Sequence, residues 1–226
     1  MSARFAVLLL AIVSAASAQE ASSPSPTAGP APVPVGPDAV WTLPPSFLQT
    51  MHKACDKRTP GRFGECFVSQ MQKAGAPDPA LAFARRTGNQ GYLRDFRDTG
   101  KVDIAHAEYP FRANENRVCF LVNGEPPMID MDDLSLIRAD ALAENAAYAA
   151  LVKRFPNLSI FPGLRFGVTA PGAANLKNGG QRFMLDFLLR DGCHACAVVG
   201  SMKVAYDFDV NGKFIETTVG PVRARR

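Results

Sequence analysis

QRFMLDFLLR (residues 181–190) and SMKVAYDFDV (residues 201–210) are the two stretches that decide the fold. In both, apolar side chains alternate with mainly polar ones, and a period of two indicates a half-buried strand. Because strands share a core only through one face of a sheet, both apolar rows must lie on the same face. Those rows are Phe183, Leu185, Phe187 and Leu189 in the first stretch and Met202, Val204, Tyr206, Phe208 and Val210 in the second.

Turn residues connect these strands to each other and to the next one. The short segment 191–197 joins the two stretches, and Asn211-Gly212 precedes a third apolar-rich run at residues 214–219. Asn-Gly between alternating segments is typical of a tight β-hairpin. The C-terminal part of the chain is therefore predicted to be an antiparallel β-meander.

Helical patterns dominate the region before residue 90. Ser46 is a candidate cap for a first helix, residues 63–71 carry a second apolar face, and Asp78-Pro79 begins a third helix. Residues 91–98 are expected to form one more short helical segment. Short strands are predicted near residues 102–109, 118–122 and 128–131.

One longer helix is predicted between this hairpin and the meander, over residues 134–155. Its second half places Tyr148, Leu151, Val152 and Phe155 on one face, and Pro156 ends it. The order of elements predicts an α+β fold with N-terminal helices, a small hairpin, a helix and a C-terminal antiparallel β-meander.

The N-terminus has the features of a secretory signal peptide. Arg4 precedes an apolar run over residues 5–13, and Ala16-Ser17-Ala18 resembles a cleavage site. The run is too short to span a bilayer. We expect residues 1–18 to be removed, which gives a secreted or periplasmic protein without a transmembrane segment.

Residues 19–45 are predicted to be a disordered, proline-rich linker, followed by a single α+β domain over residues 46–226. The linker is rich in proline, alanine and serine, a composition that favours extended chain over a packed core. The net charge of +4 is small and the basic residues are scattered, so no nucleic-acid partner is expected.

Five cysteines in an exported chain predict disulfides and one remaining thiol. Cys55 and Cys66 flank Pro60-Gly61 between two predicted helices, and an antiparallel helical pair would bring them within bonding range. We therefore expect a structural Cys55–Cys66 disulfide. Cys119, in an apolar strand, is the expected free cysteine.

Cys193-His194-Ala195-Cys196 is the sharpest chemical feature and has three interpretations. The pair could form a redox-active disulfide tuned by His194. Two thiolates and an imidazole could instead bind zinc or copper, with His52 or His106 as a further ligand. The third interpretation, a small disulfide that closes a strand corner, is favoured because residues 197–200 offer no amphipathic helix.

Other polar segments are explained by local structure. Asp207 to Gly212 matches only the first half of a calcium-binding loop, because Thr218 stands where the bidentate glutamate belongs. Residues 129–133 fit a strand end followed by a helix cap. The polar segment containing Glu108, Arg112 and Glu115 fits a surface site as well as it fits an ordinary loop.

The sequence contains no catalytic Ser-His-Asp order, phosphate-binding loop or dinucleotide-binding motif. This favours a non-enzymatic protein without a cofactor, which binds a small ligand or an exported protein partner. The expected site is a pocket between helix 134–155 and the meander. The alternative is a thiol-disulfide redox or metal-handling protein that uses Cys193, His194 and Cys196.

Overall fold

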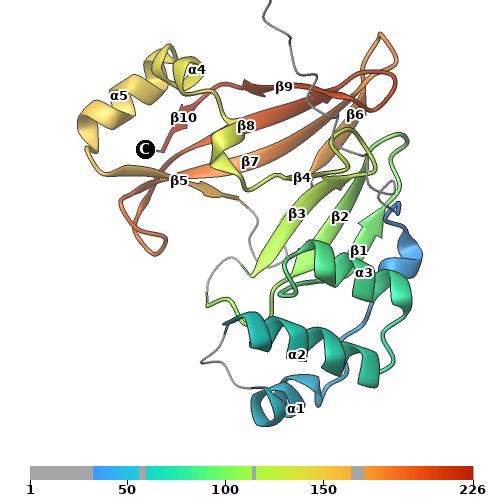
Figure 1. Cartoon of the computed structure of the whole chain (residues 1–226). Coiled ribbons are helices and arrows are strands. Elements are labelled where there is room, and N and C mark those ends of the chain that lie inside the picture. The colour runs from blue at the N-terminus through green and yellow to red at the C-terminus, as the bar shows by residue number, and fades with distance from the viewer. Residues whose placement is uncertain (1–32, 56–59, 114–115, 164–170, 226) are drawn as a thin grey trace, which may run out of the picture. The chain divides into compact units, whose positions relative to one another are not determined.

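A computed structural model describes residues 33–55, 60–113, 116–163 and 171–225, which belong to one compact unit beginning at Val33. It confirms the α+β class and the C-terminal antiparallel meander (Figure 1). The predicted signal peptide and most of the predicted linker lie outside the described residues.

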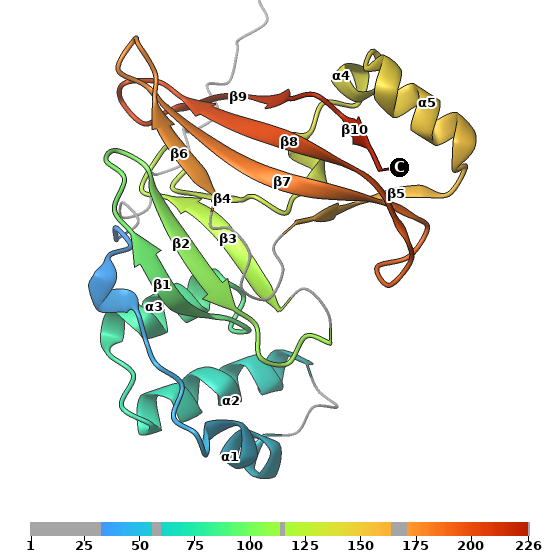
Figure 2. The ribbon, with the colours of Figure 1, turned by 180° about the vertical axis from the view of Figure 1, so that it is seen from behind.

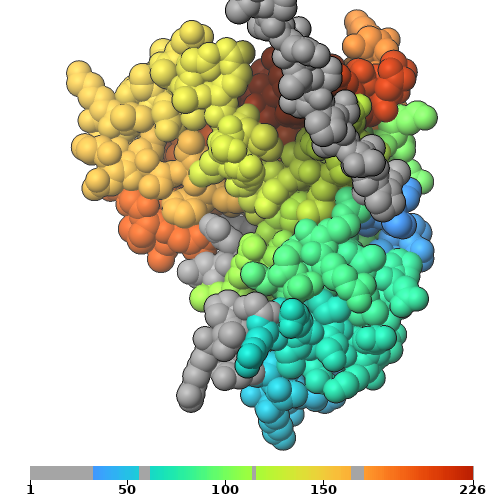
Figure 3. All heavy atoms as spheres, viewed as in Figure 1, coloured from blue at the N-terminus to red at the C-terminus, as the bar shows by residue number. Residues whose placement is uncertain are grey.

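Three helices form the first layer. They are α1 (Phe47–Ala54), α2 (Pro60–Lys73) and α3 (Asp78–Arg86). Gly75 follows α2 with a φ of 82°, a left-handed conformation that glycine adopts without steric cost. The space-filling view shows the atoms of α2 and α3 as one continuous surface (Figure 3). No helix in the described ranges is long and apolar enough to cross a membrane.

A four-stranded antiparallel sheet packs against these helices. Its strands lie in sequence order and are β1 (Tyr92–Arg97), β2 (Asp103–Glu108), β3 (Arg117–Val122) and β4 (Met128–Asp130). The prediction of a helical segment at residues 91–98 is therefore wrong. These residues pair with β2 instead, since this buries Leu93 completely on the helix-facing side of the sheet.

Both faces of this sheet are covered over part of their area. Ala105, Val118 and Phe120 pack toward Phe83 of α3, and the Phe83 and Phe120 rings lie 6.2 Å apart. Ile104 and Leu121 point the other way and belong to a core shared with the C-terminal strands. The second and third strands are thus apolar on both sides, as expected for central strands between two layers.

The C-terminal strands form a six-stranded antiparallel sheet (Figure 2). Two long central strands, β7 and β8, carry shorter strands on their outer edges. The strands are β5 (Leu158–Pro162), β6 (Gly172–Asn175), β7 (Gln181–Asp191), β8 (Val198–Phe208), β9 (Phe214–Val219) and β10 (Arg223–Ala224). β5 and β6 both pair with β7, while β9 and β10 both pair with β8.

The register of β7 and β8 confirms that both apolar rows share one face, except for Val210, which lies beyond the end of β8 and is exposed. Leu185 lies opposite Val204, and Phe187 lies opposite Met202, with all four side chains buried. Strands β5 and β6 were not predicted from the sequence. β6 falls in a segment rich in glycine and alanine, and its residues are all exposed, so no apolar pattern marks it.

The helix expected over residues 134–155 is interrupted. The segment contains a 3-10 turn, η2 (Leu134–Leu136), and two α-helices, α4 (Ala139–Ala143) and α5 (Ala146–Arg154). Asn145 separates the helices because its side chain accepts a hydrogen bond from the backbone N–H of Tyr148, which caps α5. Leu151 of α5 is buried in the core with Leu189.

Residues 33–45, expected to be linker, are part of the folded unit. Val35, Ala39 and Trp41 are buried, and η1 (Pro37–Ala39) lies between Val35 and Trp41. The backbone N–H of Trp41 donates to the carbonyl oxygen of Leu93 at 2.9 Å, and this bond attaches the segment to the edge of β1. The prolines at 34 and 37 are compatible with this path, because an edge segment leaves many backbone N–H groups unpaired.

Gln181, the first residue of β7, links the two sheets through buried hydrogen bonds. Its side-chain oxygen accepts from the Val102 N–H at 2.8 Å, and its amide nitrogen donates to the carbonyl of Thr99 at 2.7 Å and to that of Val102 at 3.2 Å. The residue is only 6% exposed. Removing the amide would leave backbone groups of the β1–β2 turn without partners in a dry environment.

We predict that Gln181→Leu lowers the free energy of unfolding by about 3 kcal/mol. The substitution keeps the side-chain volume but leaves the buried backbone groups of Thr99 and Val102 without hydrogen-bond partners. Urea denaturation of the purified protein measures the change. Gln72→Leu, on the exposed side of α2, is the matched control and is expected to stay within about 0.5 kcal/mol of the wild type. Equal losses in both variants would contradict the role assigned to Gln181.

Candidate functional site

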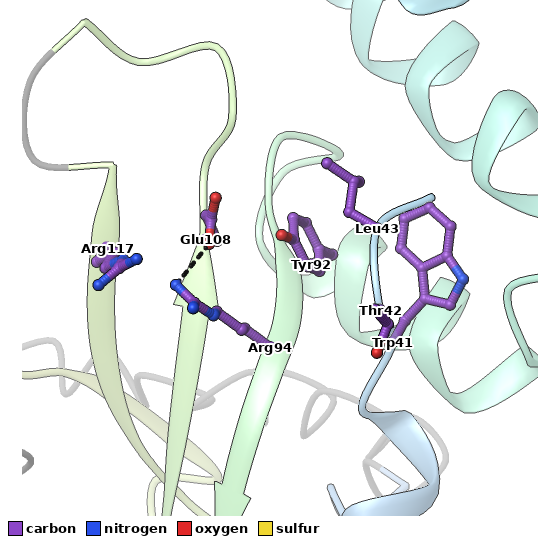
Figure 4. Close-up of a pocket in the computed structure, with 7 residues that line it drawn as sticks. All are labelled: Trp41, Thr42, Leu43, Tyr92, Arg94, Glu108 and Arg117. Carbon is purple, nitrogen blue, oxygen red and sulfur yellow. Dashed lines mark hydrogen bonds and ion pairs between the residues drawn. The ribbon is translucent and has the colours of Figure 1, made fainter. Parts of the chain in front are cut away.

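A pocket of about 440 Å³ lies between the N-terminal segment and strands β1, β2 and β3 (Figure 4). The segment 41–43 supplies one wall, and the strands supply the other. Its lining residues are Trp41, Thr42, Leu43, Tyr92, Arg94, Glu108 and Arg117. This is a different place from the pocket expected between helix 134–155 and the meander; in that region Leu151 and Ile137 belong to the buried core.

Strand register brings the polar lining residues together. Tyr92 of β1 lies opposite Glu108 of β2, and Glu108 lies opposite Arg117 of β3. The pairing of β1 with β2 shifts by one residue between Leu93 and Asp95, so Arg94 occupies a bulge. A bulge redirects the side chain of the extra residue, and Figure 4 shows Arg94 reaching toward Glu108.

The pocket combines two guanidinium groups with one carboxylate. Nη1 of Arg94 lies 3.1 Å from a carboxylate oxygen of Glu108, and these side chains are 49% and 21% exposed. Arg117 lies opposite Glu108 on the neighbouring strand, on the side away from Arg94. One negative charge therefore lies between two positive ones, which leaves the polar end of the pocket with a net positive charge.

Aromatic rings form the other end of the pocket. The ring of Trp41 packs edge-to-face against Tyr92 at 5.6 Å and against Phe47 at 5.1 Å. Burial, and then the negative charge of Glu108, raise the pKa of Tyr92 to about 12. Its hydroxyl therefore stays protonated at neutral pH and can donate a hydrogen bond toward the polar end.

A second polar row crosses the same face of the sheet, one step closer to the core. Asp95, His106 and Cys119 lie side by side on β1, β2 and β3. The Cys119 sulfur is 3.0 Å from Nδ1 of His106, within hydrogen-bonding distance. This pair was not predicted, because Cys119 was expected to be an isolated small apolar residue and His106 carried no pattern of its own.

The thiol and the imidazole are both held in their neutral forms. Burial raises the pKa of the Cys119 thiol, and burial lowers the pKa of His106 more than the nearby Asp95 carboxylate raises it. The cysteine is also 1% exposed. A nucleophilic cysteine needs a stabilised thiolate and access to substrate, and buried neutral thiols are inert. The geometry therefore favours a structural role for this pair.

The predicted cysteine motif does not line this pocket and lies in the loop between β7 and β8. Cys193 and Cys196 are within disulfide distance, with Cα atoms 5.0 Å apart. The His194 ring packs edge-to-face on Phe161 of β5, with centroids 5.4 Å apart. The next element is strand β8, so Cys193 does not stand at a helix N-terminus as in thioredoxin-like enzymes.

The other predicted residues are placed on separate elements. Cys55 and Cys66 are within disulfide distance, with Cα atoms 5.8 Å apart, where α1 meets α2. His52 faces the ring of Phe111, so neither His52 nor His106 joins the Cys193–Cys196 loop. Among the residues that the structure describes, no three His, Cys, Asp or Glu side chains form a group that could hold a metal ion.

Of the polar segment around residue 108, only part enters the pocket. Glu108 lines it, whereas Arg112 stacks its guanidinium 3.6 Å from the centre of the Tyr109 ring. Glu115 lies outside the described residues. Arg94 and Arg117 carried no signal in the sequence, since only the pairing of β1, β2 and β3 brings them together. Trp41 was missed because its segment was assigned to the linker.

Searches of protein-family models, curated proteins and solved structures found no match to this chain.

We predict that His106 makes the protein less stable in acid. Because its pKa in the folded state is below the ordinary value of 6.5, the unfolded chain binds more protons than the folded one as the pH falls. The stability gained by burying neutral His106 is fully present above pH 6.5 and is lost progressively as the pH falls below 6.5. Urea denaturation of wild type and His106→Gln at about pH 7.5 and about pH 5.5 tests the idea.

The wild type is expected to lose more stability than the variant between the two pH values. At the higher pH, the difference in unfolding free energy between wild type and variant measures the effect of the substitution itself. This effect includes any change in the contact with Cys119. An identical loss in both proteins would show that burial of His106 contributes nothing to acid sensitivity.

Proposed function

We propose that this is an exported, non-enzymatic binding protein that takes a small anionic ligand with an apolar part into the pocket lined by Trp41, Arg94 and Arg117. The observation that carries the proposal is the placement of two guanidinium groups at one end of a pocket and aromatic rings at the other. A few polar groups that fix orientation beside an apolar wall are typical of small-molecule sites.

A carboxylate is the anion that fits the polar end best. Arginine binds planar carboxylates with two parallel hydrogen bonds, and Glu108 already shows that a carboxylate fits against Arg94. The Arg94–Glu108 pair is half-exposed, so it stabilises the fold little and a ligand can compete for it. The Tyr92 hydroxyl, protonated at neutral pH, adds a donor nearby.

The apolar end suits an alkyl chain or a ring. Trp41 and Tyr92 present rigid aromatic surfaces, and Leu43 lies between them in the wall (Figure 4). Trp41 is itself held by Phe47 and by the backbone bond to Leu93. A wall that is already ordered binds a ligand without the entropy cost of immobilising its side chains.

Two observations support the other parts of the proposal. The two cysteine pairs at disulfide distance fit an oxidising compartment, as does the predicted signal peptide. The buried, neutral thiol of Cys119 beside His106 does not supply an activated nucleophile next to the pocket. Binding without turnover is therefore the function that this arrangement of side chains supports best.

Trp41 lines the pocket and is the only tryptophan in the chain, so the tryptophan fluorescence reports on ligand binding there. We predict that hexanoate and 3-phenylpropionate change the tryptophan fluorescence in a saturable way and that hexanamide, which lacks the charge, binds much more weakly. Arg94→Gln is expected to weaken carboxylate binding at least about tenfold, because it removes charge-assisted hydrogen bonds and exposes the ligand to Glu108.

Two further variants separate the pocket from general charge effects. Arg85→Gln changes the charge equally at an exposed position on α3 and should leave the affinity unchanged. Glu108→Gln should tighten binding, since it removes the carboxylate that competes for Arg94. Equal binding of hexanoate and hexanamide, or an unchanged affinity in Arg94→Gln, would refute the proposal.

A further inference from the structure

The disulfide Cys193–Cys196 is not needed to hold its loop closed. The β7–β8 ladder continues through Leu189 and Gly200 to Arg190 and Val198, and the Asp191 N–H then donates to the Ala197 carbonyl at 3.1 Å. The backbone therefore closes the hairpin up to Asp191 and Ala197, which leaves only Gly192 and the motif outside the ladder. A bond that spans only three further positions removes little entropy from the unfolded chain.

The two cysteines differ in their accessibility. Cys193 is exposed at the tip of the loop, whereas Cys196 is half-buried beside β7. An incoming thiol can therefore approach Cys193 more easily than Cys196. In thiol–disulfide exchange the attacked sulfur forms the new bond, and the other sulfur leaves as a thiolate.

A cation lies next to the cysteine that would leave. Nη1 of Arg190 donates to the carbonyl oxygen of Cys196 at 2.7 Å. Nε of the same guanidinium is buried and has no hydrogen-bond partner among the described residues. A positive charge near a sulfur lowers its thiol pKa, and a leaving thiol with a lower pKa leaves faster. The guanidinium of Arg190 is held at the backbone of Cys196, and we expect its charge to act on the leaving sulfur as a helix N-terminus does in thioredoxin-like sites.

We infer that Cys193–Cys196 is a redox-active disulfide that exchanges with external thiols, with Cys193 as the attacked sulfur and Cys196 as the leaving thiolate stabilised by Arg190. This function is independent of the ligand pocket, which lies on other strands.

The exchange proceeds in two balanced steps. The thiolate of a low-molecular-weight thiol attacks the Cys193 sulfur, a mixed disulfide forms there, and the bond to Cys196 breaks with its electron pair on Cys196. A second thiolate attacks the small-molecule sulfur, which releases a small-molecule disulfide and the Cys193 thiolate. Two external thiols are oxidised, the protein disulfide is reduced, and the two protons released by these thiols balance those taken up by the cysteines.

The full chain contains its own control in Cys55–Cys66, whose Cys55 is buried. The protein is incubated with reduced glutathione, quenched with an alkylating reagent and mapped by mass spectrometry. We expect Cys193–Cys196 to be reduced at least about tenfold faster than Cys55–Cys66, with the glutathione adduct on Cys193. Reduction of both pairs at the same rate would overturn the inference, and so would resistance of Cys193–Cys196.

Variants of Arg190 test the assignment of the leaving group. Arg190→Gln should slow the reduction severalfold, and in the reduced protein it should move the alkylation of Cys196 to higher pH. Arg190→Lys keeps the charge and should retain most of the rate. Near-ultraviolet circular dichroism verifies that each variant is folded. A glutathione adduct mainly on Cys196, or a full rate in Arg190→Gln, would contradict the role of Arg190.

Discussion

The apolar face shared by β7 and β8 is the constraint on which the rest of the structure depends. Two strands of 11 residues each present an unbroken row of large side chains, and such a face must be covered. The four-stranded sheet covers one part of it with Ile104 and Leu121, and α5 covers another part with Leu151. Gln181 then satisfies the backbone groups that this contact removes from water.

The same constraint explains where the pocket lies. Along β2 and β3, the face toward the second sheet changes from Ile104 and Leu121 to the His106–Cys119 pair, and then to Glu108 and Arg117. Only the first of these rows belongs wholly to the apolar core. Farther along the strands the side chains become charged, and the segment at Trp41, attached to the edge of β1, completes the pocket. The pocket is therefore built on the polar continuation of core strands, which hold it rigidly.

The meander could be predicted from the sequence because its signal is local. The alternation of apolar and polar residues at 183–189 and 202–208 can be read from neighbours along the chain. It is regular because only one face of these strands is buried. Helix 134–155 was predicted as continuous because an apolar face does not reveal a cap such as Asn145 in the middle of the segment. The pocket depends on the register of three strands and on a bulge at Arg94. Neither feature produces a recognisable sequence pattern within a single segment, so the pocket could not be predicted.

The attachment of the N-terminal segment has a consequence for the order of folding. Val35 donates its N–H to the side chain of Asn123, a partner 88 positions later, and Trp41 is bonded to Leu93. During synthesis, residues 33–41 leave the ribosome before either partner exists, so they cannot dock at once. Long-range contacts of this kind form slowly. Trp41 should therefore stay accessible on a nascent chain that stops before Leu93, and a chaperone that captures aromatic residues would find it there.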